Sequence, residues 1–293
     1  MKKIYTTIIF TLAIACAVAQ SYLPQSTGEK IEHNYYTLSY NEEHEQAEWV
    51  YYQLTPASLS GTTERTNDFR SDKSVSTGSA TLADYVGSGY DRGHLCPAGS
   101  MVINLTAMSE SFYLSNMSPQ NPSFNRGRWK ELEEKVRAFA MADSMLHVVT
   151  GPLFASTLGS IGESRVTIPA AYYKVLYSPK KGEMIGFMMQ NCKLDGPLES
   201  YATTIDQIEA ISDINFFAHF DDQLATQEST INLDAWDFDG VSTPKTTQVK
   251  ASQSETSTKK TANSNQCQAI TSSGNQCKRT AESGSKYCWQ HKK

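Results

Sequence analysis

The sequence predicts an α+β fold, with a mainly antiparallel sheet at its core and a short Cys- and His-rich module at its end. Strand-like and helical segments are mixed in the first 240 residues without the strict βαβ alternation of a parallel sheet. A strand, a second strand and a helix are expected between residues 90 and 137, where polar side chains suited to catalysis are also concentrated. A length of 293 residues is ample for a buried core, in one large or two small domains.

Residues 1–19 predict a secretory signal peptide. Two lysines are followed by an apolar run over residues 8–18, and cleavage is expected after Ala19. The run is too short to cross a bilayer, and no later stretch approaches that length. We therefore expect a soluble mature protein that is exported to the periplasm or out of the cell, without stable membrane association. A lipoprotein anchored at Cys16 is the alternative, although the preferred lipobox leucine is missing.

Two strands are expected next, over residues 35–40 and 48–54, because side chains alternate in polarity on both sides of a turn. Residues 58–81 are rich in Ser, Thr, Gly and charged side chains, which indicates a long surface loop. This loop carries Arg65 and Arg70, and loops of such length often line a binding site.

The following segment brings polar side chains between apolar stretches. Residues 90–101, YDRGHLCPAGSM, contain the charged quartet Asp91-Arg92-Gly93-His94, and the apolar residues 112–114 are expected to form a strand. An amide-rich turn follows, with Asn116, Gln120, Asn121 and Asn125. The next helix begins near Arg126 and buries one face, since apolar side chains recur at steps of three and four residues.

Later segments complete the predicted core. Residues 146–151, 166–177 and 184–190 are apolar and rich in β-formers, which indicates central strands. Residues 203–211 have isoleucines at steps of three, typical of a short helix, and residues 215–220 add aromatic side chains. These segments make residues 20–240 one expected domain.

The composition changes sharply beyond residue 240. Residues 241–265 have almost no apolar side chain and predict a disordered basic linker before a module of residues 266–293. Three thiolates and an imidazole of this module suit a tetrahedral Zn²⁺ site, and so short a segment needs such a staple to fold. The expected Zn²⁺ ligands are Cys267, Cys277, Cys288 and His291. Disulfides are the alternative in an exported protein, although five mature cysteines do not close into intrachain pairs.

The polar residues of the central segment suit hydrolysis of a phosphodiester with one divalent cation. Mg²⁺ takes oxygen ligands, keeps most of its waters and needs few protein anchors, so the amide oxygen of Asn125 can hold it. The cation would stabilise the departing 3′ oxygen as a Lewis acid. A neutral imidazole at His94 can take the proton of the attacking water, and the guanidinium of Arg92 can bind the same phosphate.

These motifs resemble a known family. DRGH, then NMSPQ, then N-x3-W-x2-LE is similar to the DNA/RNA non-specific endonucleases, the relatives of Serratia nuclease and endonuclease G, whose active site is a ββα-metal (His-Me) finger. The resemblance spans residues 35–220 and includes NDFRSDKSV, VVTGPLF and IDQIEAISDINFF. It implies an endonuclease that depends on Mg²⁺ (or Mn²⁺), cleaves DNA and RNA with little sequence preference and leaves 5′-phosphate ends.

The resemblance also implies roles for single residues of the central segment. His94 matches the general base, Asn125 the protein ligand of Mg²⁺ and Arg92 the phosphate-binding arginine. Asn116 matches an active-site amide that helps to set the geometry around the histidine. Asn125 alone would also suit a helix N-cap, a role that competes for the same amide oxygen. The W-x2-LE that follows favours the metal.

Three further residues match the family on the helix and the long loop. Glu133 matches a carboxylate that reaches the metal through water, and Arg137 an arginine of the same helix. These two are also placed for an i,i+4 ion pair, so an ordinary surface salt bridge is the alternative. Arg70 is our choice for the upstream arginine, and Arg65 takes its place if the loop is threaded differently.

Charge is divided between the body and the tail. Residues 241–293 hold nine Lys and Arg against two acidic residues, a formal charge of +7, and the rest holds 17 basic and 29 acidic residues, a formal −12. Affinity for a nucleic-acid backbone comes from counterions that basic residues release. Because residues 1–240, the body of the protein, are acidic, either their arginines must be gathered at the site or the basic tail must tether the substrate. A solvated linker with incidental lysines is the alternative.

Two function classes remain open on these grounds. The first is a secreted, metal-dependent endonuclease, and the second is a catalytically inactive nucleic-acid-binding or adhesion protein that keeps the fold and works through its tail. A sequence-specific HNH-type nuclease is disfavoured because no groove-reading helix or ribbon is recognisable. Cys96, beside the proposed base, is expected to be buried or bonded to Cys192. The oligomeric state is left open, with a homodimer as one option.

Overall fold

The computed structural model describes residues 22–218 and 221–239, and residues 268–269, 276, 281 and 285–287 near the end of the chain. The chain divides into two compact units, Met1–Lys245 and Thr246–Lys293. The signal peptide and the linker lie outside the described residues, and so do the four expected Zn²⁺ ligands, Cys267, Cys277, Cys288 and His291. These assignments stay predictions.

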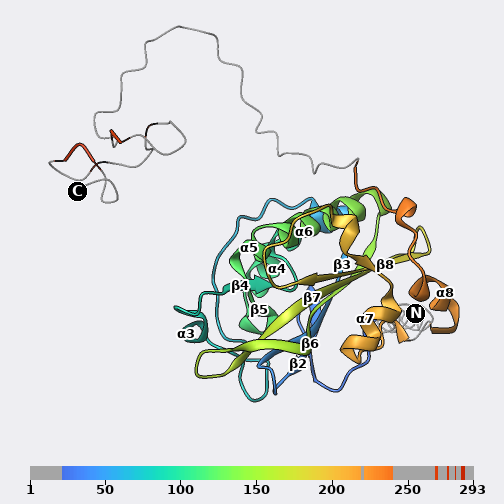
Figure 1. The fold of residues 1–293 in the computed structure, drawn as a ribbon, viewed down its shortest axis with the longest axis horizontal. Helices are drawn as coiled ribbons and strands as arrows, with labels where there is room; N and C mark the ends of the chain where they lie inside the picture. The colour runs from blue at the N-terminus through green and yellow to red at the C-terminus, as the bar shows by residue number, and fades with distance from the viewer. Residues whose placement is uncertain are drawn as a thin grey trace, which may run out of the picture. The chain divides into compact units, whose positions relative to one another are not determined.

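The first unit is built on one antiparallel sheet of seven strands, in the order β1-β2-β3-β6-β7-β8-β9 (Figure 1). The strands are β1 Glu29–Glu32, β2 Tyr36–Asn41, β3 Gln46–Leu54, β6 Leu146–Ile161, β7 Val166–Ser178, β8 Glu183–Gln190 and β9 Ala202–Thr203. The predicted α+β class with a mainly antiparallel sheet is therefore confirmed. All five strands predicted outside the central segment are present, and β6 runs further than expected.

Helices cover both faces of the sheet (Figure 1). Successive side chains of β3 point to opposite faces, so Tyr52 joins a core with α6, Arg128–Asp143, while Trp49 joins a second core with α7, Ile205–Ser212. The remaining α-helices are α2 Pro56–Leu59, α3 Leu82–Tyr85, α4 Leu105–Glu110, α5 Pro122–Asn125 and α8 Asp221–Ser229. Within the described residues, none of the helices has the length and apolarity that a membrane crossing requires.

A separate two-stranded ribbon precedes α5 and α6. Its strands, β4 Asp91–His94 and β5 Met117–Gln120, pair antiparallel with Gly93 opposite Ser118. A Cβ added to Gly93 would lie 2.1 Å from the side chain of Gln120, so only glycine fits this close approach. The ribbon followed by helices gives the strand–strand–helix order that the sequence predicts.

The second strand of this ribbon is not the one expected. Residues 112–114 were assigned to a strand for their apolarity, but the chain there turns into a 3-10 segment, Leu114–Asn116. Their backbone pairs briefly with the long loop, since the amide of Arg70 donates to the carbonyl of Phe112 and the amide of Leu114 to the carbonyl of Arg70. Apolarity correctly indicated the burial of Phe112 and Leu114, while the extended strand lies in the sequence MSPQ that follows.

Helix α6 begins two residues later than the expected Arg126. The one-turn helix α5 occupies residues 122–125, and Gly127 then serves as the N-cap of α6. A Cβ at Gly127 would lie 2.4 Å from the carbonyl oxygen of Ser123, so the tight link between the two helices requires glycine. The predicted apolar face is buried, and it consists of Trp129, Leu132, Val136, Phe139 and Ala140.

Candidate active site

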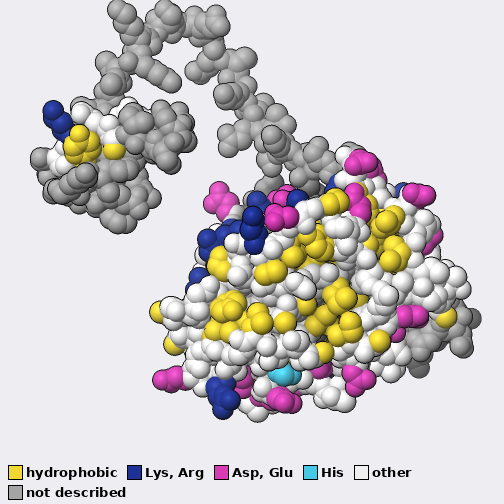
Figure 2. Space-filling model, viewed as in Figure 1, with side chains coloured by type: hydrophobic (Ala, Val, Ile, Leu, Met, Phe, Trp, Pro, Cys, Tyr) yellow, Lys and Arg dark blue, Asp and Glu magenta, His cyan; other side chains and the backbone are white. Residues whose placement is uncertain are grey.

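One cavity of about 500 Å³ collects most of the predicted site residues. It is formed by the long loop, β4, the turn after β4, α5 and the first half of α6. The charged and amide side chains that line it are Arg65, Arg92, His94, Asn125, Arg126, Lys130, Glu133 and Arg137. In Figure 2, Lys and Arg side chains gather over α5 and the start of α6. Basic side chains are thus gathered at this site although the body as a whole is acidic, which agrees with the hypothesis that arginines at the site supply the affinity for nucleic acid.

His94, the last residue of β4, lies at the inner wall of the cavity and is 8% exposed. Burial, with a smaller contribution in the same direction from the positive charges of Arg65 and Arg92, lowers the pKa of its imidazole to about 3. The ring is therefore neutral at pH 7 and has a free lone pair. Its Nε2 has no hydrogen-bond partner among the described residues.

Asn125, at the end of α5, does not cap α6. Its Nδ2 donates to Oδ2 of Asp91 at 2.9 Å, and the N-cap position of α6 belongs to Gly127. Because the amide nitrogen is used by Asp91, the amide oxygen is the atom left for a ligand. Asp91 also accepts from Nε of Arg126 at 2.8 Å, so one carboxylate holds both side chains.

Asp91 belongs to the candidate site through its contacts with Asn125 and Arg126. It is part of the charged quartet, but the sequence alone does not indicate its role. Its position three residues before His94 was the available signal. A carboxylate at the start of this strand can pair with an amide or an arginine of the facing turn. Only the fold shows which amide that is.

Glu133 lines the same cavity on the first half of α6. Burial raises the pKa of its carboxyl to about 7, against the opposing charges of Lys174, Arg137 and Arg65. The ion pairs formed by this part of α6 join Arg128 to Glu131 and Lys130 to Glu134, so the described contacts do not include the Glu133–Arg137 salt bridge that was the alternative. These two side chains are presented to the cavity instead.

Lys174 is a second residue that sequence reasoning missed. It is fully buried in β7, where its Nζ donates to Oγ1 of Thr150 at 2.5 Å and to the hydroxyl of Tyr52 at 3.3 Å. Burial lowers the pKa of its ammonium to about 8, and the carboxylate of Glu133 raises it. A single lysine inside an otherwise apolar strand was the available signal, since buried lysines are rare without a partner.

Two predicted residues lie outside the cavity. Nη1 of Arg70 donates to Oδ2 of Asp68 and to the carbonyl of Ser109, both at 2.9 Å, and its guanidinium lies 4.0 Å from the ring centroid of Tyr113. The choice of Arg70 as the upstream arginine is therefore not supported, and Arg65, the alternative, lines the cavity. The reason is the threading of the loop, which points Arg70 toward α4.

Asn116 is fully buried behind the cavity. Its Oδ1 accepts from the amide of Cys96 at 2.8 Å, and its Nδ2 donates to the carbonyls of Cys96 and Ser111 at 2.9 and 2.8 Å. Two of these hydrogen bonds fix the backbone of Cys96, two residues after His94, and the third joins the carbonyl of Ser111, so its described hydrogen bonds all go to backbone groups and none points to a substrate. Its predicted role around the histidine can be exerted only through this backbone.

Cys96 and Cys192 are both free thiols. The disulfide alternative for this pair is wrong, because Cys96 is fully buried while Cys192 is exposed. Burial also raises the pKa of the Cys96 thiol well above its ordinary value, so it stays protonated and unreactive. A catalytic thiol beside His94 is thereby excluded.

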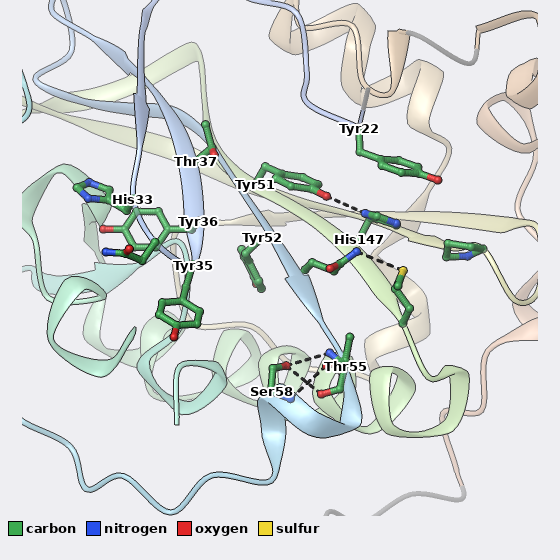
Figure 3. A pocket seen from close by; sticks show the side chains of 14 residues that line it. Tyr22, His33, Tyr35, Tyr36, Thr37, Tyr51, Tyr52, Thr55, Ser58 and His147 are labelled. Carbon is green, nitrogen blue, oxygen red and sulfur yellow. Dashed lines mark hydrogen bonds between the residues drawn. The ribbon is translucent and has the colours of Figure 1, made fainter. Parts of the chain in front are cut away.

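A larger cavity of about 550 Å³ lies elsewhere in the first unit (Figure 3). Tyrosines and two histidines dominate its lining, and His147 stacks on Tyr22 with ring centroids 3.7 Å apart. It contains no charged Asp, Glu, Lys or Arg side chain and none of the predicted catalytic residues. A phosphodiester therefore has no counter-charge in this cavity, and the smaller, polar one remains the candidate.

The sequence profile of the DNA/RNA non-specific endonucleases matches residues 17–223, more than half of the chain. The chain belongs to this family. It is 37% identical over 217 residues to nuclease C1 of Cunninghamella echinulata var. echinulata, over 68% of this chain and 86% of that nuclease. It is also 37% identical over 198 residues to mitochondrial endonuclease G of Homo sapiens, over 62% of this chain and 67% of that protein.

A solved structure, that of the EndoG/EndoGI complex, has the same fold with a TM-score of 0.61 at 29% identity, over 66% of this chain and 87% of that chain. The predicted resemblance is confirmed, and the chain is a hydrolytic nuclease. Within the described residues, no group of three or more His, Cys, Asp or Glu side chains is placed to hold a metal ion.

Proposed function

We propose that the candidate site hydrolyses phosphodiester bonds within DNA and RNA, with His94 as general base and Asn125 as the protein ligand of Mg²⁺ or Mn²⁺. The observation that carries the proposal is the meeting of a neutral, buried imidazole, an oriented amide and several guanidiniums in one cavity. The ribbon β4–β5 with α5 and α6 is, in this proposal, the ββα-metal finger of the family.

The imidazole of His94 is suited to accept a proton. Its lowered pKa leaves it unprotonated at neutral pH, with a free site for the proton of a water molecule that attacks phosphorus. The negative charge of a bound phosphate offsets the charges of Arg65 and Arg92 and so raises the basicity of the ring toward the range of an effective base. Arg65 and Arg92 line the same cavity, and their guanidiniums bind the phosphate oxygens and stabilise the charge that builds up on them. The base and the cations therefore act on one phosphate.

The residues present fit a hard divalent cation. Asp91 uses the nitrogen of the Asn125 amide and leaves its oxygen, and the carboxylate of Glu133 in the same cavity can bind a metal through water. One protein oxygen suffices because Mg²⁺ keeps waters and takes phosphate oxygens as its other ligands. When bound, the cation would supply Lewis-acid stabilisation of the departing oxygen.

Cleavage with little sequence preference follows from what the cavity offers a nucleic acid. Its guanidiniums and amide recognise phosphate and metal, and such contacts carry no sequence information. The nuclease relatives support both DNA and RNA as substrates. We further propose that the protein is exported by residues 1–19 and that the tail cysteines with His291 bind Zn²⁺.

The proposal is tested by a plasmid-nicking assay on native protein and His94→Ala, each with Mg²⁺ and with EDTA. His44→Ala is a matched control, since His44 is a half-buried histidine stacked on Phe154 at 3.7 Å outside the cavity. We expect native protein and the control to nick only with metal and His94→Ala to lose nearly all activity. Equal nicking by His94→Ala overturns the mechanism, and an inactive native protein supports the binding or adhesion alternative.

A further inference from the structure

Two phenylalanines behind the catalytic cavity contact each other at right angles. Phe69 comes from the long loop and Phe112 from the turn after α4, and their ring centroids are 4.8 Å apart with an interplanar angle of 90°. Such edge-to-face packing is a preferred geometry of aromatic pairs. Phe112 is fully buried, and Phe69 is half-buried and lines a smaller cavity of about 290 Å³ together with Arg65 and Arg92, so the pair is anchored in the protein at one end and exposed beside the arginines at the other.

Both rings also pack against the imidazole of His94. Its centroid lies 5.9 Å from that of Phe69 at 61° and 5.0 Å from that of Phe112 at 88°. A catalytic histidine is ordinarily oriented by a hydrogen bond from its second ring nitrogen to a carboxylate or carbonyl. The buried Nε2 of His94 has no such partner among the described residues, so we infer that these two ring contacts orient the imidazole.

The same two rings carry the two phosphate-binding arginines. The guanidinium of Arg92 lies 4.2 Å from the centroid of Phe69, and that of Arg65 lies 4.7 Å from the centroid of Phe112. Stacking on an aromatic face is a favourable position for a guanidinium and limits its range of orientations. The aromatic pair therefore contacts the base and both arginines at once.

We propose that the pair Phe69–Phe112 positions His94, Arg92 and Arg65 relative to one another, and that Phe69 is a positioning residue of the nuclease. The inference rests on the proposed function, since it assigns the pair to that reaction. Loss of the Phe69 ring removes one contact of the imidazole and the support of one guanidinium together. The turnover rate and the apparent affinity for substrate should then fall in the same variant.

The variant that tests this is Phe69→Leu, with Phe69→Tyr as the conservative replacement that keeps the ring. Phe154→Leu is the matched control, because Phe154 is also a half-buried phenylalanine on a histidine, His44, outside the cavity. Steady-state cleavage of a fluorescent oligonucleotide gives kcat and KM, and thermal unfolding reports whether each variant is folded.

We expect Phe69→Leu to lower kcat about ten-fold, since small displacements of catalytic groups cost one to two orders of magnitude, and to raise KM several-fold. Phe69→Tyr should restore both constants to within about two-fold of native protein, because edge and face contacts remain. Phe154→Leu should match native protein in kcat and KM.

The inference is overturned if Phe69→Leu, folded as judged by its unfolding transition, has the kcat and KM of Phe154→Leu. It is also overturned if Phe69→Tyr is as impaired as Phe69→Leu, because the ring would then not be the cause. Neither result affects the proposed function, which fails on a different observation, namely equal cleavage by native protein and His94→Ala.

Discussion

Replacement of Asp91 by alanine removes the side chain that holds the proposed metal ligand. The carboxylate accepts from Nδ2 of Asn125 at 2.9 Å and from Nε of Arg126 at 2.8 Å. The ion pair is exposed on one side, since 71% of the Arg126 side chain and 17% of that of Asp91 are accessible, and such pairs contribute little. The bond to Asn125 is part-buried and charge-assisted, and bonds of this kind contribute about 1.5–3 kcal/mol.

The loss should appear as weaker Mg²⁺ binding. Without the carboxylate, the amide of Asn125 can rotate away from the orientation that presents its oxygen. Removal of such a supporting partner costs about 10–100-fold in metal affinity, which matches the free energy of the lost hydrogen bond. We therefore expect the Mg²⁺ concentration for half-maximal nicking to rise by about that factor in Asp91→Ala.

The assay is the initial nicking rate as a function of Mg²⁺ concentration, with Arg126→Ala as the control. That control removes the exposed ion pair and keeps the bond between Asp91 and Asn125, so its half-saturating Mg²⁺ concentration should stay within about three-fold of native protein. An unchanged Mg²⁺ dependence in Asp91→Ala refutes the reasoning. An equal shift in both variants also refutes it, because the arginine would then account for the effect.

Three further predictions concern buried charge and the tail. Burial lowers the pKa of His147 to about 4, so between pH 6.5 and 4 the unfolded chain binds a proton that the folded protein does not, and the free energy of unfolding decreases as the pH falls. At pH 5 this decrease amounts to about 2 kcal/mol. In urea unfolding, His147→Gln should therefore lose about 2 kcal/mol less stability than native protein between pH 7 and pH 5, and an equal loss in both proteins would contradict the prediction. Lys174→Met removes the largest of the positive charges that keep the pKa of Glu133 from rising further, so the carboxyl of Glu133 should be mostly protonated at pH 7. Nicking at pH 7 should then fall about ten-fold and recover at higher pH, and an unchanged pH profile would contradict this. Deletion of residues 241–293, which carry a formal +7, should weaken DNA binding and flatten its dependence on salt while turnover at saturation is kept, and an unchanged salt slope contradicts the tether.

Much of the fold could be predicted from local patterns. Five of the seven strands of the large sheet and the buried face of α6 follow from periodicity or β-forming composition, which are properties of neighbouring residues, while the short β1 and β9 were not predicted. The ribbon could not be predicted in the same way, because β5 is the polar sequence MSPQ and is held by pairing with β4 and not by its own propensity. Phe112 and Leu114 are buried without being part of a strand, which shows that apolarity predicts burial better than conformation.

The candidate site shows the same division. His94 and Asn125 were found from the chemistry of the central segment and Glu133 from the family resemblance, and the fold brings the three to one cavity. The choice between Arg65 and Arg70 depends on the path of the long loop, which no local pattern determines. Lys174 lies far from the motif in the chain and reaches the site through the sheet, so its electrostatic contact with Glu133 is visible only in three dimensions.

The central claim is that the amide oxygen of Asn125 and the imidazole of His94 act on one phosphate in one cavity. Anomalous diffraction from crystals of His94→Ala grown with Mn²⁺ and a short DNA tests it directly. The account predicts an Mn²⁺ ion about 2–2.3 Å from Oδ1 of Asn125, in contact with a phosphate oxygen, beside the position that the imidazole would occupy. An Mn²⁺ ion bound elsewhere, or DNA whose phosphates avoid this cavity, would contradict it.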